Sequence, residues 1–239
     1  MYAFDYQRPT SRDAAKSAAA GADTRYLAGG QSLIQAMRLR LSQSERLVDL
    51  GAVADLKGIR AENNGVTIGA MSTHATVASN ADVKRVVPAI AELAGGIGDP
   101  MVRNMGTIGG SIANADPAAC YPAGVLAFNA TIHTDRRTIA ADDFFTGLWE
   151  TALKPGELIT AVAFPAAQKA AYVKYRQPAS RFPGLNRCVS TPRRHMSTRG
   201  MPRPRSWLSA NVEGTSVREA SRWIWSTRFH AQFSRKGTP

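Results

Sequence analysis

The segments that decide the fold are Ala28-Gly29-Gly30-Gln31-Ser32-Leu33 and Gly106-Thr107-Ile108-Gly109-Gly110-Ser111. Each carries two adjacent glycines, which leave backbone N–H groups uncovered by side chains. The first lies between residues 24–28, a predicted strand, and residues 33–39, which have helical periodicity. A helix start adds a partial positive charge, so the segment suits an anionic pyrophosphate group. A plain strand-to-helix turn is an equal alternative.

The second segment also brings small residues close to a prospective ligand. Thr107 and Ser111 offer hydroxyls, and Asn114 and Asp116 follow with groups that can bond a ribose or ribityl chain. The alternative is a Gly-rich surface loop. Two such segments in one chain favour a single long ligand that carries phosphate and is bound across both.

Other ligand motifs are missing from the sequence. No Gly-Lys-Ser/Thr follows either segment, and Gly96-Ile97-Gly98 lacks the third glycine of a dinucleotide fingerprint. The two cysteines and four histidines have no metal-binding spacing, so metal chemistry is expected on a partner. We interpret His74 as a packed or capping histidine, and Asp142-Asp143 as a helix start rather than an acid/base pair.

Strand and helix patterns alternate without a regular βαβ repeat, which favours an α+β fold. Asn63-Asn64-Gly65 predicts a tight hairpin turn in which glycine supplies a positive φ, and residues 101–114 are expected to be irregular. The predicted strands are 24–28, 47–50, 58–61, 66–70, 130–134, 138–140, 157–164 and 171–176, and the predicted helices are 14–20, 33–39, 73–78, 83–94 and 118–128.

The two glycine segments, together with residues 69–73, Arg103-Asn104-Met105 and Ala115-Asp116-Pro117, resemble the flavoprotein (medium) subunit of aerobic carbon monoxide dehydrogenases. That subunit belongs to the xanthine dehydrogenase family of molybdenum hydroxylases. Residues 155–159 and 172–182 continue the resemblance, which extends from residue 1 to about 182.

The resemblance implies an FAD-binding fold of the p-cresol methylhydroxylase type over residues 1–176, with FAD between two α+β subdomains of roughly 1–55 and 56–176. Ile159 and Lys174 match positions near the isoalloxazine ring. Cys120 stands where the family usually has Asp, which removes a polar contact of about 1 kcal/mol. The implied FAD-binding residues are Ala28, Gly29, Gly30, Gln31, Ser32, Leu33, Thr107, Ile108, Gly109, Gly110, Ser111, Asp116, Cys120, Ile159 and Lys174.

The resemblance also implies an electron-transfer role without a catalytic side chain. Electrons would pass from iron–sulfur clusters of a small subunit through FAD to an external acceptor, while the molybdenum cofactor would lie on a large subunit. A stand-alone FAD-dependent oxidase of the same fold is the alternative. The N-terminus has no signal-peptide pattern, and no apolar stretch is long enough to span a membrane, so a cytoplasmic protein is expected.

The surplus of positive charge is concentrated at the end of the chain. Residues 1–183 hold 19 Lys or Arg and 16 Asp or Glu, whereas residues 184–239 hold 11 and 2. With Trp207, Trp223 and Trp225, this segment leaves nucleic-acid binding as a weaker alternative, since it has no known nucleic-acid-binding motif. The family pattern stops after Phe182, so we predict that residues 177–239 are a remnant or frame-shifted C-terminal domain, poorly ordered, with a short helix at 218–225.

Overall fold

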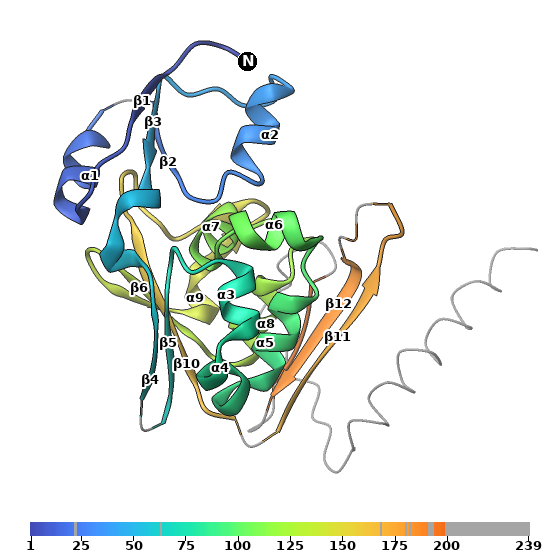
Figure 1. Cartoon of the computed structure of the whole chain (residues 1–239). Helices are drawn as coiled ribbons and strands as arrows, with labels where there is room; N and C mark the ends of the chain where they lie inside the picture. The colour runs from blue at the N-terminus through green and yellow to red at the C-terminus, as the bar shows by residue number, and fades with distance from the viewer. Residues whose placement is uncertain are drawn as a thin grey trace, which may run out of the picture.

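The N-terminal part of the chain forms a small parallel sheet flanked by helices. The computed structural model describes residues 1–21, 23–62, 64–167, 169–179, 181, 183–190 and 194–198. The sheet has the strand order β1-β3-β2, and Ser11 caps the first helix by accepting from the Ala14 amide at 3.2 Å. Its elements are β1 (Asp5–Gln7), α1 (Arg12–Ala18), β2 (Thr24–Leu27), α2 (Leu33–Arg38) and β3 (Arg46–Asp49), in the upper part of Figure 1.

A second, antiparallel sheet follows two short 3-10 turns, Leu50–Ala52 and Ala54–Leu56. Its strand order is β4-β5-β10-β6-β7. The predicted hairpin is present, but Gly65 is the first residue of its second strand and has no positive φ. A Cβ there would lie 2.4 Å from the Phe164 carbonyl oxygen, so this glycine permits close strand approach. The strands are β4 (Ile59–Glu62), β5 (Gly65–Gly69), β10 (Ile159–Pro165), β6 (Thr131–Thr134) and β7 (Thr138–Ala140).

Helices cover one face of this sheet. They are α3 (His74–Ser79), α4 (Ala81–Val86), α5 (Pro88–Gly95), α6 (Pro100–Met105), α7 (Ile108–Asn114), α8 (Tyr121–Ala127) and α9 (Ala141–Phe144), the last leading into the small hairpin of β8 (Phe145–Gly147) and β9 (Glu150–Thr151). Asp142 and Asp143 lie in the first turn of α9, as the helix-start interpretation predicted.

One predicted helix and one region predicted to be irregular differ from the structure. The single helix expected over 83–94 is broken at Pro88, which begins α5 because proline cannot continue the preceding helix. The region expected to be irregular, 101–114, contains α6 and α7. Asp99 caps α6 by accepting from the Val102 amide at 2.9 Å, and Thr107 caps α7 in the same way.

Two apolar cores hold these layers together. The larger core lies between the five-stranded sheet and its helices and includes Tyr121, Phe144 and Phe164. The smaller core lies under the N-terminal sheet, where Met71 and Leu158 from the second part pack with residues such as Val48. The N-terminal part therefore shares apolar contacts with the rest of the molecule.

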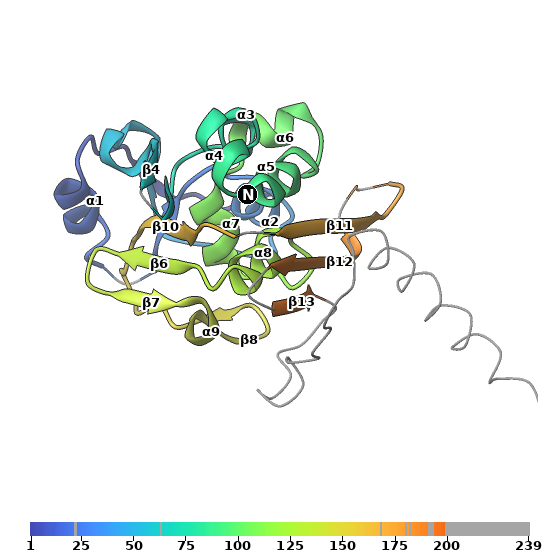
Figure 2. The same cartoon turned by 90° about the horizontal axis from the view of Figure 1, so that it is seen from below.

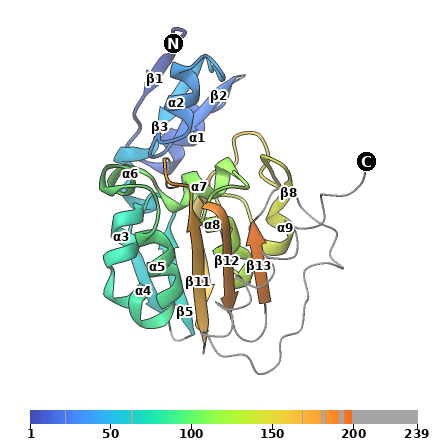
Figure 3. The same cartoon turned by 90° about the vertical axis from the view of Figure 1, so that its right-hand side faces the viewer.

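A third sheet extends the folded body past residue 176. It contains β11 (Ala170–Arg176), β12 (Pro183–Ser190) and β13 (Arg194–Thr198) in that order, all antiparallel, and is seen in Figures 2 and 3. The expected boundary at 176/177 thus falls between two paired strands. The prediction for 218–225 and the three C-terminal tryptophans lie outside the described residues.

The β12 strand was missed because its inward positions are not all apolar. Asn186, Cys188 and Ser190 alternate along it and are all buried. The Asn186 side chain donates to the Ala119 carbonyl at 3.0 Å, and the Ser190 hydroxyl donates to the Ala127 carbonyl. A search for alternating apolar residues rejects such a strand, although every second side chain points inward.

Candidate functional site

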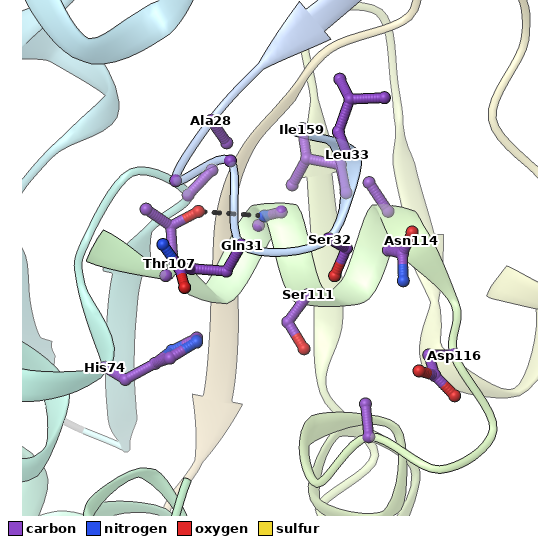
Figure 4. Close-up of a pocket in the computed structure, with 18 of the residues that line it drawn as sticks. Ala28, Gln31, Ser32, Leu33, His74, Thr107, Ser111, Asn114, Asp116 and Ile159 are labelled. Atoms are coloured by element: carbon purple, nitrogen blue, oxygen red, sulfur yellow. Dashed lines mark hydrogen bonds between the residues drawn. The ribbon is translucent and has the colours of Figure 1, made fainter. Parts of the chain in front are cut away.

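A cavity of about 410 Å³ lies where the N-terminal sheet meets the helical layer, and Figure 4 shows part of its lining. Both glycine segments contribute to the wall. Ile108 alone among the predicted site residues does not, because its side chain is fully buried in the larger core. The predicted residues that line the cavity are Ala28, Gly29, Gly30, Gln31, Ser32, Leu33, Thr107, Gly109, Gly110, Ser111, Asp116, Cys120, Ile159 and Lys174.

The first glycine segment presents a row of unpaired backbone donors. It arches over α7 in Figure 4, and Gly30 has φ of +70°, a conformation that favours glycine. Among the described residues, no acceptor is found for the amides of residues 29–32. All four residues line the cavity. Successive free N–H groups with a left-handed residue among them form a concave site for an anion.

The second glycine segment has a different role from the one its sequence indicated. Its amides are already used inside the protein, so the start of α7 offers few donors to a ligand. A Cβ at Gly109 would lie 2.6 Å from the Ala70 Cβ, which makes this glycine a packing requirement. The donated bonds run from Ile108 to Ser72 O (3.2 Å), Gly109 to Ala70 O (2.9 Å), Gly110 to Thr107 Oγ1 (3.2 Å) and Ser111 to Thr107 O (3.0 Å).

The two segments also touch each other directly. A Cβ at Gly29 would lie 2.1 Å from the Met105 carbonyl oxygen and 2.7 Å from the Gly106 Cα. No side chain fits into that space, so the two backbones meet in van der Waals contact. The glycines therefore bring the amide row of the first part of the chain onto the helical layer of the second.

Polar side chains follow the other side of the cavity. Figure 4 shows Ser111, Asn114 and Asp116 along α7 and the residues after it. One Asp116 carboxylate oxygen accepts from the Ala118 amide at 2.7 Å, which leaves the other for a ligand. Burial raises the pKa of Asp116. These groups suit hydroxyl-bearing parts of a ligand, as the sequence predicted for Asn114 and Asp116.

Cys120 and Lys174 form a contact in the cavity wall. The Lys174 ammonium lies 3.4 Å from the Cys120 sulfur and donates to the Gly96 carbonyl oxygen at 2.9 Å. Cys120 is 4% exposed and unbridged. The lysine is thus held by a backbone carbonyl in addition to the thiol, which is a weak hydrogen-bonding partner.

His74 is both a packed residue and part of the cavity wall. Its ring lies 5.4 Å from that of Tyr121, and its Nδ1 atom is buried without a hydrogen-bond partner. Burial, and next the charge of Arg103, lower the pKa of His74 to about 4, so the ring is neutral at pH 7. The sequence interpretation as a packed histidine agrees with this geometry but did not place it at the cavity.

Sequence reasoning missed other lining residues because their types are common on any surface. Arg25, Tyr26, Met71, Glu157 and Arg181 belong to this group. Met71, Glu157 and Arg181 lie within stretches that carry the family resemblance, but no binding role was predicted for them. Within the described ranges, no three His, Cys, Asp or Glu side chains are placed to hold a metal ion, and no helix is long and apolar enough to cross a membrane.

The chain is similar to proteins of one flavin-binding family. The family described as "FAD binding domain in molybdopterin dehydrogenase" matches residues 2–167. The carbon monoxide dehydrogenase medium chain of Afipia carboxidovorans is 44% identical over 168 residues, which cover 68% of this chain and 58% of that protein. The glyceraldehyde dehydrogenase medium chain of Sulfolobus acidocaldarius is 41% identical, with 68% and 59% covered.

The comparison with solved structures points to the same family. A carbon monoxide dehydrogenase from Hydrogenophaga pseudoflava matches with a TM-score of 0.79 at 34% identity, covering 82% of this chain and 75% of that one. The chain therefore belongs to the family of FAD-binding domains in molybdopterin dehydrogenases, and its fold is the expected FAD-binding α+β fold. Its cofactor is FAD. The matched part spans slightly less than three fifths of the length of the curated relatives quoted above.

Proposed function

We propose that this chain is the FAD-binding, electron-transfer subunit of a molybdenum hydroxylase. It would accept electrons from iron–sulfur clusters of a small partner subunit and deliver them to an external acceptor, while the molybdenum cofactor acts on a large subunit. The similarity to medium chains of carbon monoxide and glyceraldehyde dehydrogenases supports this assignment. Bound FAD supplies the redox chemistry, and the protein supplies position and electrostatics.

The row of unpaired amides at residues 29–32 carries the proposal. Four adjacent N–H groups that have no acceptor in the described part of the chain, in the wall of a cavity of about 410 Å³, are the donors that a diphosphate requires. The residues present therefore fit FAD. The amide row would hold the diphosphate, Asn114 and Asp116 would bond hydroxyl groups, and Ile159 would supply apolar contact.

The remaining side chains of the wall orient the ligand rather than react with it. Lys174 is held by the Gly96 carbonyl and would present its ammonium to a polar edge of the cofactor. His74 is neutral at pH 7 and would contribute ring packing to the wall rather than a charge. We place the subunit in the cytoplasm, since Cys120 and Cys188 are both unbridged, as thiols are in reducing compartments.

A negative charge beside the amide row tests the proposal. Ser32 precedes α2 at its N-cap position, where aspartate is also favoured, so Ser32→Asp preserves the helix start. The new carboxylate repels a diphosphate and competes for the free amides. We expect the FAD dissociation constant to rise at least about tenfold, measured by fluorescence titration of the purified full-length chain.

Ser11→Asp provides the matched control, because Ser11 caps α1 and does not line the cavity. This variant should bind FAD like the unchanged chain. Equal FAD affinity in Ser32→Asp and Ser11→Asp would contradict the placement of the diphosphate. A full-length chain that takes up no FAD at all would contradict the proposed function itself.

A further inference from the structure

A buried carboxylate lies at the junction between the N-terminal part and the five-stranded sheet. Asp135 follows β6, and its side chain is 4% exposed. Its Oδ1 atom accepts from the Leu158 amide at 2.9 Å, and its own amide donates to the Leu158 carbonyl. Leu158 lines the cavity, so Asp135 is fixed on the backbone of a cavity residue.

The other carboxylate oxygen of Asp135 is neutralised from the N-terminal part. The Lys16 ammonium on α1 lies 3.2 Å from Oδ2, and the Arg136 guanidinium lies 3.7 Å from it. Oδ2 has no hydrogen bond in addition to these ionic contacts. Lys16 is therefore the closer of the two cations, and it comes from a residue 119 positions away in the sequence.

A second polar contact crosses the same junction. Tyr26 in β2 donates its hydroxyl to the Gly156 carbonyl oxygen at 3.2 Å. Burial, and next the charge of Asp135, raise the pKa of Tyr26. Tyr26 is followed by Leu27, the last residue of β2, and then by the first glycine segment. The strand that carries Tyr26 therefore leads directly into the amide row.

Loss of the Lys16 ammonium in the packed molecule would leave the buried Asp135 carboxylate with Arg136, at 3.7 Å, as its remaining ion-pair partner among the described residues. A buried charge that loses its closest partner is strongly disfavoured, whereas exposed ion pairs contribute little. The contact between Gly29 and Gly106, which also joins the two parts at the cavity, is a backbone packing contact without charge. The Lys16–Asp135 ion pair thus joins the N-terminal part to the five-stranded sheet beside the cavity.

We propose that Asp135 is a positioning residue for FAD: through Lys16 it holds the amide row of residues 29–32 against the cavity, so that cofactor retention depends on this ion pair. The proposal rests on the proposed function, because it assumes that FAD occupies the cavity. Neither Lys16 nor Asp135 needs to touch the cofactor.

The test measures FAD release from the full-length chain carrying Lys16→Gln, Asp135→Asn or both. Asn at position 135 still accepts from the Leu158 amide, so the turn is preserved. We expect each single variant to release FAD at least about tenfold faster, and the double variant to release it no faster than the singles, since one interaction is lost in all three. Lys16→Arg should restore slow release.

Arg12→Gln is the matched control. Arg12 lies one turn before Lys16 on α1, and its pair with Asp55 is exposed on both sides, at 49% and 62%. This variant should release FAD like the unchanged chain. Raising the salt concentration should speed release from the unchanged chain more than from Asp135→Asn.

A second measurement separates positioning from general stability. The melting temperature of the FAD-free protein should change little in Asp135→Asn, because this variant removes the buried charge itself and leaves a partly exposed lysine, and little in Arg12→Gln, whose pair is exposed; only Asp135→Asn should release FAD faster. The proposal is overturned when the pair variants release FAD at the rate of Arg12→Gln, or when the effects of the two single variants add. Absence of FAD binding by the unchanged chain would overturn the proposed function, and this proposal with it.

Discussion

Glu157 shows how a charged residue is accommodated beside the cavity. Its side chain is fully buried, and its two oxygens accept from the Arg137 guanidinium at 2.9 and 3.0 Å. The Thr134 hydroxyl and the Lys154 amide each donate at 2.8 Å. These bonds, that from Arg137 above all, lower the pKa of Glu157 to about 2. The carboxylate is therefore charged and satisfied at any physiological pH.

Glu157→Gln should destabilise the protein in a pH-dependent manner. The folded pKa of about 2 lies below the ordinary value of 4.5, so the stabilisation is complete above about pH 4.5 and lost as pH falls through 2. We expect a loss of about 3 kcal/mol in the free energy of unfolding at pH 7, shrinking toward zero near pH 2. Urea unfolding at several pH values measures it.

An exposed pair gives the comparison for this variant. Asp82 and Arg85 lie three residues apart on α4, with side chains 43% and 66% exposed. Asp82→Asn should change the free energy of unfolding by less than about 0.5 kcal/mol. A Glu157→Gln difference that stays constant from pH 7 to pH 2.5 would show that the lost contacts are not electrostatic.

The α8 helix depends on β12 at both of its ends. Asn186 binds the Ala119 carbonyl just before the helix, and Ser190 binds the Ala127 carbonyl at its last residue. Asn186→Ala would remove the partner of the Ala119 carbonyl, in the cavity wall beside Cys120. We expect a loss of about 1–2 kcal/mol in the free energy of unfolding, together with weaker FAD binding. Arg187→Ala, on the same strand but less buried, should cost less, and an equal cost would contradict this account.

These elements also show which features a sequence reveals. Regular patterns such as 66–70 and 138–140 were found because their apolar residues mark one face. The short helices α6 and α7 were hidden by their Gly and Asn content, and β12 by inward Asn and Ser. The two glycine segments were predicted to bind a phosphate-bearing ligand from their own residues, and the resemblance supplied the full list of FAD-binding residues. The use of amides 29–32 but not 108–111 depends on tertiary acceptors such as Ala70, which no local pattern indicates.

In the sequence of the whole molecule, all described residues that line the cavity lie at or before Pro183. The structural match covers 82% of this chain, and the match to the curated medium chain covers 68% of it. The last 41 residues, 199–239, carry eight Lys or Arg against two Asp or Glu. Half of the net charge of +12 thus lies in a segment separate from the described cavity lining.

Two truncated chains separate these segments experimentally. A chain that ends at residue 198 retains β12 and the full described cavity lining, so its FAD dissociation constant should stay within about twofold of that of the full chain. A chain that ends at residue 182 lacks β12, loses both anchors of α8 and should lose FAD binding. Salt-sensitive retention on DNA, measured in parallel, should be weaker for residues 1–198 than for the full chain, because half of the net charge of +12 is removed. Loss of FAD binding in the 198-residue chain, or full binding in the 182-residue chain, would show that the site is built differently.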